Sequence, residues 1–137
     1  MAFDGKHSEL TKQIIGAFFK VYNTLGYGFS EKVYENALLI ELNKLGLKVE
    51  QQAPIKVFYD GQNVGDYIAD VLVEDQVLLE LKAVRTLMGE NEAQLLSNLK
   101  ATTIEVGLLL NFGPKPQFMR NVFDNTLKGS LSWTHPG

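Results

Sequence analysis

The chain has 137 residues, of which 45% are hydrophobic, and it contains no cysteine. This length suffices for one domain with a real core and is too short for two. The lack of cysteine excludes a disulfide framework, a thiolate zinc site and a thiol nucleophile. The chain has 13 Lys and Arg residues against 16 Asp and Glu, a net charge of -3, which argues against a protein that coats nucleic acid by charge alone.

The sequence also gives no sign of a membrane partner. No run of about 18 apolar residues occurs, and the opening MAFDGKHSEL lacks a long apolar segment, so we expect a cytoplasmic protein. The two histidines, His7 and His135, lie near opposite ends of the chain, which disfavours a zinc site or a Ser–His–Asp triad.

Two amphipathic helices are expected first, over residues 8–25 and about 31–45. The sequence GYG between them indicates a sharp turn that needs the freedom of glycine. The expected capping residues are, in chain order, Ser8, Gly26, Ser30 and Gly46.

Strand patterns take over after the second helix. The expected strands are LKVEQQ (47–52), IKVFY (55–59), YIADVLV (67–73), VLLELKA (77–83), VGLLLNF (106–112) and FMRNVF (118–123), with a hairpin turn at Asp60-Gly61 and a helix from Glu90 to Ala101 before the fifth. This order predicts a single α/β domain. Its early strands form an antiparallel meander, and the late helix crosses over to a parallel strand.

Three charged residues interrupt the apolar strands: Asp70, Glu80 and Lys82. A hairpin centred on Asp75 pairs residues whose numbers sum to 150, so Asp70 should lie directly across from Glu80. Glu80 and Lys82 share a strand face, because side chains alternate along a strand. The inferred register therefore gathers the three charges into one patch.

Two carboxylates about 5 Å apart repel each other, and burial without compensation would cost several kcal/mol. A divalent cation removes this problem, since Mg²⁺ takes one or two carboxylates, keeps several waters and leaves room for a phosphate. A nearby lysine could stabilise the charge of a phosphoryl transition state. The alternative interpretation is a solvated strand face on which Glu80 and Lys82 form an ordinary surface ion pair.

The sequence resembles the PD-(D/E)XK nuclease superfamily, whose core is αβββαβ. Asp70, Glu80 and Lys82 match its D-x₉-E-x-K pattern on neighbouring strands. The segment GFSEKVY is similar to the GxxExxY family, with Gly28, Glu31 and Tyr34 at the named positions, and later blocks follow in the same order. The resemblance implies an αβββαβ domain with a mixed sheet flanked by helices.

The resemblance also implies a set of site residues. Asp70, Glu80 and Glu31 would bind Mg²⁺ or Mn²⁺, and Lys82 would be the catalytic lysine. Gln94 matches the glutamine that helps to orient the substrate or the lysine in RecB-like nucleases. For Glu31 the alternative is a carboxylate favoured only by the helix dipole.

Other positions could contact substrate: Tyr34, Asn98 and Lys100. Asn98 stands where the RecB-like pattern prefers tyrosine, one turn from Gln94; it can form hydrogen bonds but cannot stack on a base. For Tyr34 the alternative is packing, with its hydroxyl holding a loop or Glu31.

The leading hypothesis is therefore a metal-dependent nuclease, with DNA rather than RNA as the expected substrate and a homodimer as one way to complete its groove. The rival hypothesis is a non-catalytic module that retains the fold and binds nucleic acid or protein. The low basic content and Asn98 favour the rival, and the intact Asp70, Glu80 and Lys82 oppose it.

Overall fold

The computed structural model describes residues 5–137 and forms a single α/β domain. Its elements are α1 (Ser8–Leu25), α2 (Glu31–Lys44), β1 (Val49–Tyr59), β2 (Gln62–Val73), β3 (Val77–Lys82), α3 (Gly89–Ala101), β4 (Val106–Phe112), β5 (Pro116–Val122) and the short 3₁₀ helices η1 (Asn125–Leu127) and η2 (Ser132–Thr134). This order confirms the αβββαβ core expected from the sequence.

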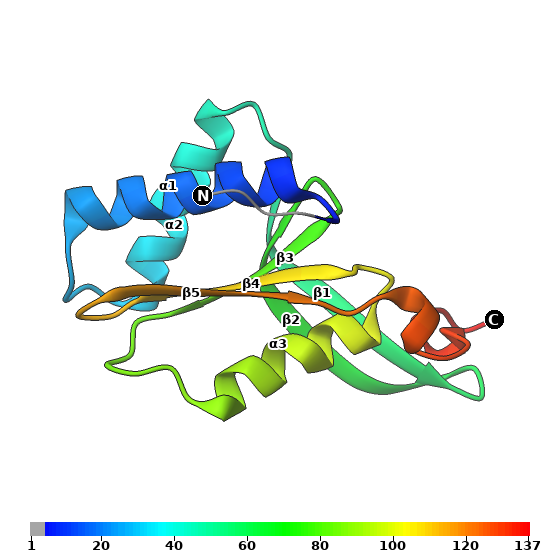
Figure 1. Ribbon diagram of the computed structural model, residues 1–137. Coiled ribbons are helices and arrows are strands. Elements are labelled where there is room, and N and C mark those ends of the chain that lie inside the picture. Colours follow the sequence, from blue (N-terminus) through cyan, green and yellow to red (C-terminus); the bar gives the residue numbers. More distant parts are fainter. Residues whose placement is uncertain (1–4) are drawn as a thin grey trace.

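A five-stranded sheet in the order β1-β2-β3-β4-β5 forms the middle layer. Helices α1 and α2 lie on one face of the sheet and α3 lies on the other (Figure 1). Strands β1, β2 and β3 pair antiparallel, β3 pairs parallel with β4, and β4 pairs antiparallel with β5. The helix α3 is therefore the crossover between two parallel strands, as expected. Within residues 5–137, no helix is both long enough and apolar enough to span a membrane.

The helix ends agree with the expected caps in part. Gly26 and Gly46 follow α1 and α2 with φ values of 66° and 75°, in the region that favours glycine. Ser30 is the residue before α2, although its side chain makes no capping bond. The expectation for Ser8 is wrong: the helix already includes it, and His7 stands at the N-cap, where its carbonyl accepts a hydrogen bond from the Thr11 N–H.

Strand β1 is continuous where two short strands were expected. The chain does bend there, because Gln52 has a φ of 56° inside the strand. Ala69 packs against the core on the α3 side, whereas Val71 packs against the core on the α1 and α2 side. Residues two apart in a regular strand share a face. The regular alternation of side chains along β2 is therefore interrupted at Asp70, so that residues before and after it face opposite sides of the sheet.

Tyr34 ties helix α2 to the sheet and to the preceding loop. Its side chain is fully buried and stacks on Phe112, with 4.5 Å between the ring centroids. Its hydroxyl donates a hydrogen bond to the Gly26 carbonyl at 2.5 Å and accepts one from the Phe29 N–H at 3.2 Å. The packing alternative for this residue is confirmed, and its hydroxyl holds the GYG loop.

The end of β4 fixes the chain that follows β3. The buried Asn111 side chain accepts a hydrogen bond from the Val84 N–H at 3.0 Å and donates one to the Val84 carbonyl at 2.9 Å. At Gly113 there is no room for a side chain, because a Cβ would lie 2.0 Å from the Val84 carbonyl oxygen. These contacts hold the backbone two residues after Lys82.

We expect Gly113→Ala to lower the free energy of unfolding by more than about 2 kcal/mol, because the new methyl group displaces the Val84 backbone. The matched control is Gly16→Ala within α1, where a Cβ meets nothing within 4 Å. Alanine favours an exposed helix by up to about 1 kcal/mol over glycine, so this variant should be as stable as the wild type or more so. Urea unfolding measures both; equal stabilities for the two variants would contradict the close approach.

Candidate active site

Asp70 and Glu80 are brought together by the pairing of β2 with β3. Val71 pairs with Leu79 and Leu72 pairs with Leu78, which is the register predicted from the hairpin centred on Asp75. One step further along the same register, Asp70 stands across from Glu80. Their carboxyl groups are close enough to share a hydrogen bond.

Each carboxyl group has a second partner. One oxygen of Asp70 accepts a hydrogen bond from the Leu81 N–H at 2.7 Å, so the aspartate is anchored to the backbone beside Glu80. Oε1 of Glu80 accepts a hydrogen bond from Nδ2 of Asn98 on α3 at 2.6 Å. Glu80 is only 2% exposed, which excludes the alternative of a solvated surface ion pair with Lys82.

The environment disfavours two negative charges on this pair. Burial, followed by the negative charge of Asp70, raises the pKa of Glu80 to about 8 despite the opposing effects of Asn98 and Lys82. Burial also raises the pKa of Asp70, and the Leu81 N–H only partly offsets it. In the absence of a cation, the two carboxyl groups therefore hold a proton up to an unusually high pH.

Lys82 lies at the end of β3 and is half-buried. Its positive charge lowers the pKa of both carboxyl groups. Within residues 5–137 its ammonium group forms no ion pair within 4.0 Å.

A third carboxylate approaches the pair from α2, and it belongs to Glu35. This side chain is 5% exposed, and its negative charge contributes to the raised pKa of Asp70. Burial acts to raise the pKa of Glu35 itself, but hydrogen bonds from Gln51, Lys32 and Gln52 leave it below its ordinary value. Glu35 is therefore an anion held in place beside the Asp70 carboxyl.

Gln52 connects this carboxylate to the bend in β1. The pairs Gln51–Val71 and Ala53–Ala69 place Gln52 across from Asp70. Its left-handed backbone is a costly conformation for a residue that is not glycine, of order 1 kcal/mol or more. Its Nε2 donates to both oxygens of Glu35, at 3.1 and 3.2 Å. Such strain is common where a site demands a particular geometry.

The donor set suits a hard cation that keeps part of its water shell. Among residues 5–137, no three His, Asp or Glu side chains are clustered tightly enough to form a complete ligand cage. Mg²⁺ needs no such cage, since one or two carboxylates with waters and phosphate oxygens complete its coordination. Asp70 and Glu80 would hold the ion, which would take the place of the shared proton.

A model of the PD-(D/E)XK nuclease superfamily matches residues 8–122. The chain belongs to this superfamily. No curated protein matches the chain. A solved structure titled "Crystal structure of SSO0001" is 17% identical, with a TM-score of 0.46. Their alignment covers 92% of this chain and 64% of that one.

The superfamily match spans all of the charged site residues and ends before the C-terminal segment, residues 123–137. Asp70 on β2 and Glu80 and Lys82 on β3 have the spacing D-x₉-E-x-K, and the structure brings the two acids together. The match is to the superfamily as a whole, so the narrower resemblance to the GxxExxY family stays a prediction.

The remaining predicted residues lie in four different settings. Glu31 is exposed on the first turn of α2, and Gln94 is exposed on α3. Tyr34 is buried and holds the GYG loop, which leaves it no surface for a substrate. Asn98 is 2% exposed and binds Glu80, so it positions the carboxylate. Lys100 donates its ammonium to the Lys128 carbonyl, at the C-terminal end of α3.

Sequence reasoning missed Glu35 and Gln52. A signal for Glu35 was present, since it precedes Leu38 and Leu42 by three and seven residues and so lies on the buried face of α2. A buried glutamate on an apolar helix face needs a partner. For Gln52 there was no local signal, because its bend depends on pairing with β2.

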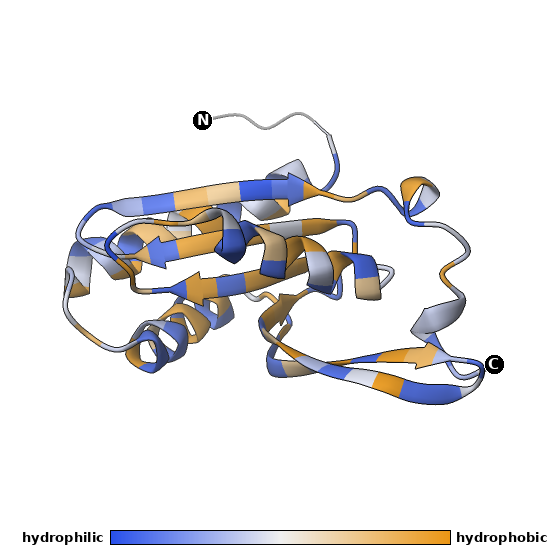
Figure 2. Cartoon of the chain, turned by 90° about the horizontal axis from the view of Figure 1, so that it is seen from below, coloured by the Kyte–Doolittle hydropathy of each residue, from blue (hydrophilic) through white to orange (hydrophobic). Residues whose placement is uncertain are grey.

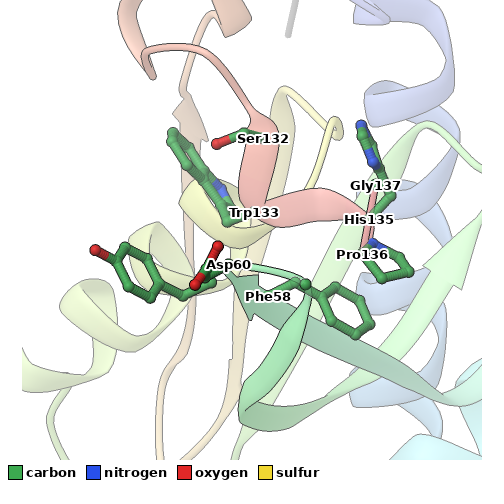
Figure 3. Close-up of a pocket in the computed structure, with 9 residues that line it drawn as sticks. Phe58, Asp60, Ser132, Trp133, His135, Pro136 and Gly137 are labelled. Carbon is green, nitrogen blue, oxygen red and sulfur yellow. The ribbon is translucent and has the colours of Figure 1, made fainter.

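A second group of polar residues gathers at the far end of the molecule. Ser132, His135 and Asp60 line a cavity of about 680 Å³ between the β1–β2 hairpin tip and the C-terminal segment (Figure 3). The Ser132 hydroxyl instead bonds to the Ser130 hydroxyl at 3.0 Å, and among residues 5–137 no hydrogen bond joins it to His135. This group is not a hydrolase triad, and it lies apart from the carboxyl pair.

The stability of the metal-free protein should depend on Glu80. A carboxyl whose pKa rises from 4.5 to about 8 on folding binds its proton more tightly in the folded chain. In EDTA, the contribution of Glu80 to the free energy of unfolding should therefore be greatest below pH 4.5. It should be lost as the pH rises through about 8, which lowers the free energy of unfolding by on the order of a few kcal/mol.

Glu80→Gln keeps the shape of the side chain and an oxygen for Asn98 but cannot ionise. We expect this variant to lose most of the fall and to exceed the wild type in stability at pH 8.5. Urea unfolding from pH 5 to pH 9 measures the difference; parallel pH profiles for the two proteins would argue against a strained carboxyl pair.

Proposed function

We propose that this chain is a metal-dependent nuclease that hydrolyses phosphodiester bonds of nucleic acid. The observation that carries the proposal is the buried Glu80 beside the half-buried Asp70, a pair whose two carboxylates a cation between them would stabilise. Superfamily membership supports the same chemistry, since D-x₉-E-x-K is the motif of its metal-dependent nucleases.

Asp70 and Glu80 would hold Mg²⁺ or Mn²⁺. The ion would neutralise charge on the scissile phosphate and make water a better nucleophile. Asn98 and the Leu81 N–H each fix one of the two carboxyl groups, so the ligands need little rearrangement on binding. Such preorganisation is the main way in which a protein contributes to charge stabilisation.

Lys82 would stabilise the attacking oxygen or the charge that develops on the phosphate. Lys82 is half-buried, its ammonium has no ion-pair partner among residues 5–137, and its charge lowers the pKa of both carboxyl groups. Glu35, rather than the exposed Glu31, would supply the carboxylate from helix α2 and bind waters beside Asp70. Gln94 would approach the substrate from the exposed side of α3.

The proposal extends to partners and setting. DNA is the expected substrate, the narrower family is the GxxExxY family, and the location is cytoplasmic. The net charge of -3 implies local contact with nucleic acid, and a homodimer is one arrangement that would widen the contact.

The second candidate function is a binding module that keeps the fold without catalysis. The acidic net charge and the absence of a three-residue ligand cage within residues 5–137 favour it. Two measurements with Mn²⁺ separate the candidates. One is the change in the stability of the protein, and the other is the cleavage of a labelled nucleic acid.

We expect Mn²⁺ at pH 8 to raise the melting temperature of the wild type by several degrees, because the ion relieves the repulsion between Asp70 and Glu80. Asp70→Asn removes one ligand and should lose most of this shift. Differential scanning fluorimetry with Mn²⁺ and with EDTA measures it. Equal shifts in the two proteins would count against the metal site.

The control Lys82→Met separates binding of the metal from catalysis. This variant should keep the Mn²⁺-induced shift in melting temperature. Its rate of cleavage of labelled DNA and RNA should fall about 100-fold or more, as is typical when one group that stabilises the transition-state charge is removed. Cleavage at the wild-type rate in this variant would point to contamination or to another site.

Two glutamates one turn apart on α2 provide a matched comparison. Glu35→Gln removes the buried charge beside Asp70 and should reduce cleavage at least about tenfold. Losses of this size are common when a residue that supports a metal ligand is replaced. Glu31→Gln alters an exposed carboxylate and should leave cleavage within about twofold. Initial rates with Mn²⁺ measure both. The reverse order would restore Glu31 as the helical carboxylate.

A further inference from the structure

A groove of about 460 Å³ lies between the outer half of the β1–β2 hairpin, the last turns of α3 and the 3₁₀ helix η2. Val57, Tyr59, Tyr67, Ser97, Lys100 and Trp133 are among the residues that line it. In Figure 1 the hairpin extends past α3 toward the C-terminal end of the chain, which places these elements side by side. Figure 2 shows hydrophobic residues among the hydrophilic ones along this part of the hairpin.

The groove carries flat aromatic surfaces that are open to solvent. Tyr59 is 76% exposed and Tyr67 is 47% exposed, although a tyrosine on a sheet normally covers its neighbours. Exposed aromatic side chains in a row are the surfaces on which unpaired bases stack.

Trp133 is held in place before any ligand arrives. Its indole N–H donates a hydrogen bond to the Lys100 carbonyl at 2.9 Å, in the last turn of α3. The Lys100 ammonium lies 4.6 Å from the centroid of the Trp133 ring. Nearby, the buried Lys128 ammonium donates to the Thr102 and Ile104 carbonyls and fastens the C-terminal segment to the end of α3. A fixed aromatic platform loses little entropy when it binds.

The charge of the groove complements a phosphate backbone. Lys100 is the charged residue among those that line it in the described chain, and its side chain is exposed. The neighbouring cavity differs, since Asp60 and His135 lie there (Figure 3). In a protein of net charge -3, a groove with one cation and no carboxylate is a suitable place for a polyanion.

Both walls of the groove belong to elements that also carry the carboxyl pair or its partner. Tyr67 precedes Asp70 by three residues on β2, a distance of about 10 Å along a strand. On the opposite wall, Ser97 directly precedes Asn98, which binds Glu80.

We propose that this groove binds an unpaired strand of nucleic acid and directs it to Asp70 and Glu80. Bases stack on Tyr59, Tyr67 and Trp133, and a phosphate meets Lys100. The preferred substrate is therefore single-stranded or carries a single-stranded tail. This inference deepens the proposed nuclease function, and its second half rests on that function.

Trp133 offers a direct readout of binding, because it is the only tryptophan in the sequence. A 12-residue oligothymidylate, titrated in EDTA so that no cleavage occurs, should quench its fluorescence to saturation. A 12-residue oligouridylate tests RNA, and a blunt-ended DNA hairpin without unpaired tails should leave the fluorescence unchanged. The inference is overturned if neither single strand quenches the fluorescence, or if the blunt hairpin quenches it equally. A groove that binds an apolar peptide would show no quenching by either single strand.

Tyr67→Leu keeps an apolar side chain at the strand position but removes the ring. It should weaken binding of the oligothymidylate at least about fivefold, which is the low end for loss of one stacked base. Tyr27→Leu is the control, since Tyr27 is 55% exposed in the loop between α1 and α2. Wild-type affinity in Tyr67→Leu, with thermal melting to verify its fold, would contradict the stacking role.

Cleavage with Mn²⁺ separates this inference from the proposed function. The wild type should cut a tailed hairpin faster than a blunt one, and Tyr67→Leu should lose that preference. Equal cleavage of tailed and blunt hairpins by the wild type would overturn the inference and leave the nuclease intact. Saturable quenching without cleavage of any substrate would instead overturn the nuclease and support the groove as a binding site.

Discussion

The mutual repulsion of one buried and one half-buried carboxyl group governs this structure. Asp70 and Glu80 stand across from each other on neighbouring strands, in a position where burial raises the pKa of both and that of Glu80 reaches about 8. A protein built only for stability would replace such a pair with apolar residues of similar size. The surrounding contacts keep the pair instead: Asn98 and the Leu81 N–H each bond to one carboxyl group and so hold the two acids at close range.

The bend in the sheet is part of the same arrangement. On one side of Asp70 the strand packs toward α3, and on the other side it packs toward α1 and α2. Gln52, across from Asp70, takes the strained backbone that this change requires and also holds Glu35. Helix α2 and helix α3 lie on opposite faces of the sheet, and the bend explains how Glu35 from one and Asn98 from the other can serve the same pair.

Much of this arrangement was predictable because it depends on local patterns. Alternating apolar residues gave the strands, and the hairpin centred on Asp75 gave the register that pairs Asp70 with Glu80. The helical spacing of Glu35 predicts its burial, but the roles of Gln52 and Trp133 were not predictable in this way, since each depends on contacts between residues distant in sequence. The exposed position of Glu31 has the same origin: the motif names a glutamate on α2, but only the packing of the helix decides which turn is buried.

The C-terminal segment, residues 123–137, lies beyond the region that matches the superfamily, yet it supplies Trp133. Of the three aromatic residues assigned to the proposed groove, Tyr59 and Tyr67 lie within the matched region and Trp133 lies outside it. Substitutions in residues 123–137 would therefore alter one wall of the groove without changing Asp70, Glu80 or Lys82.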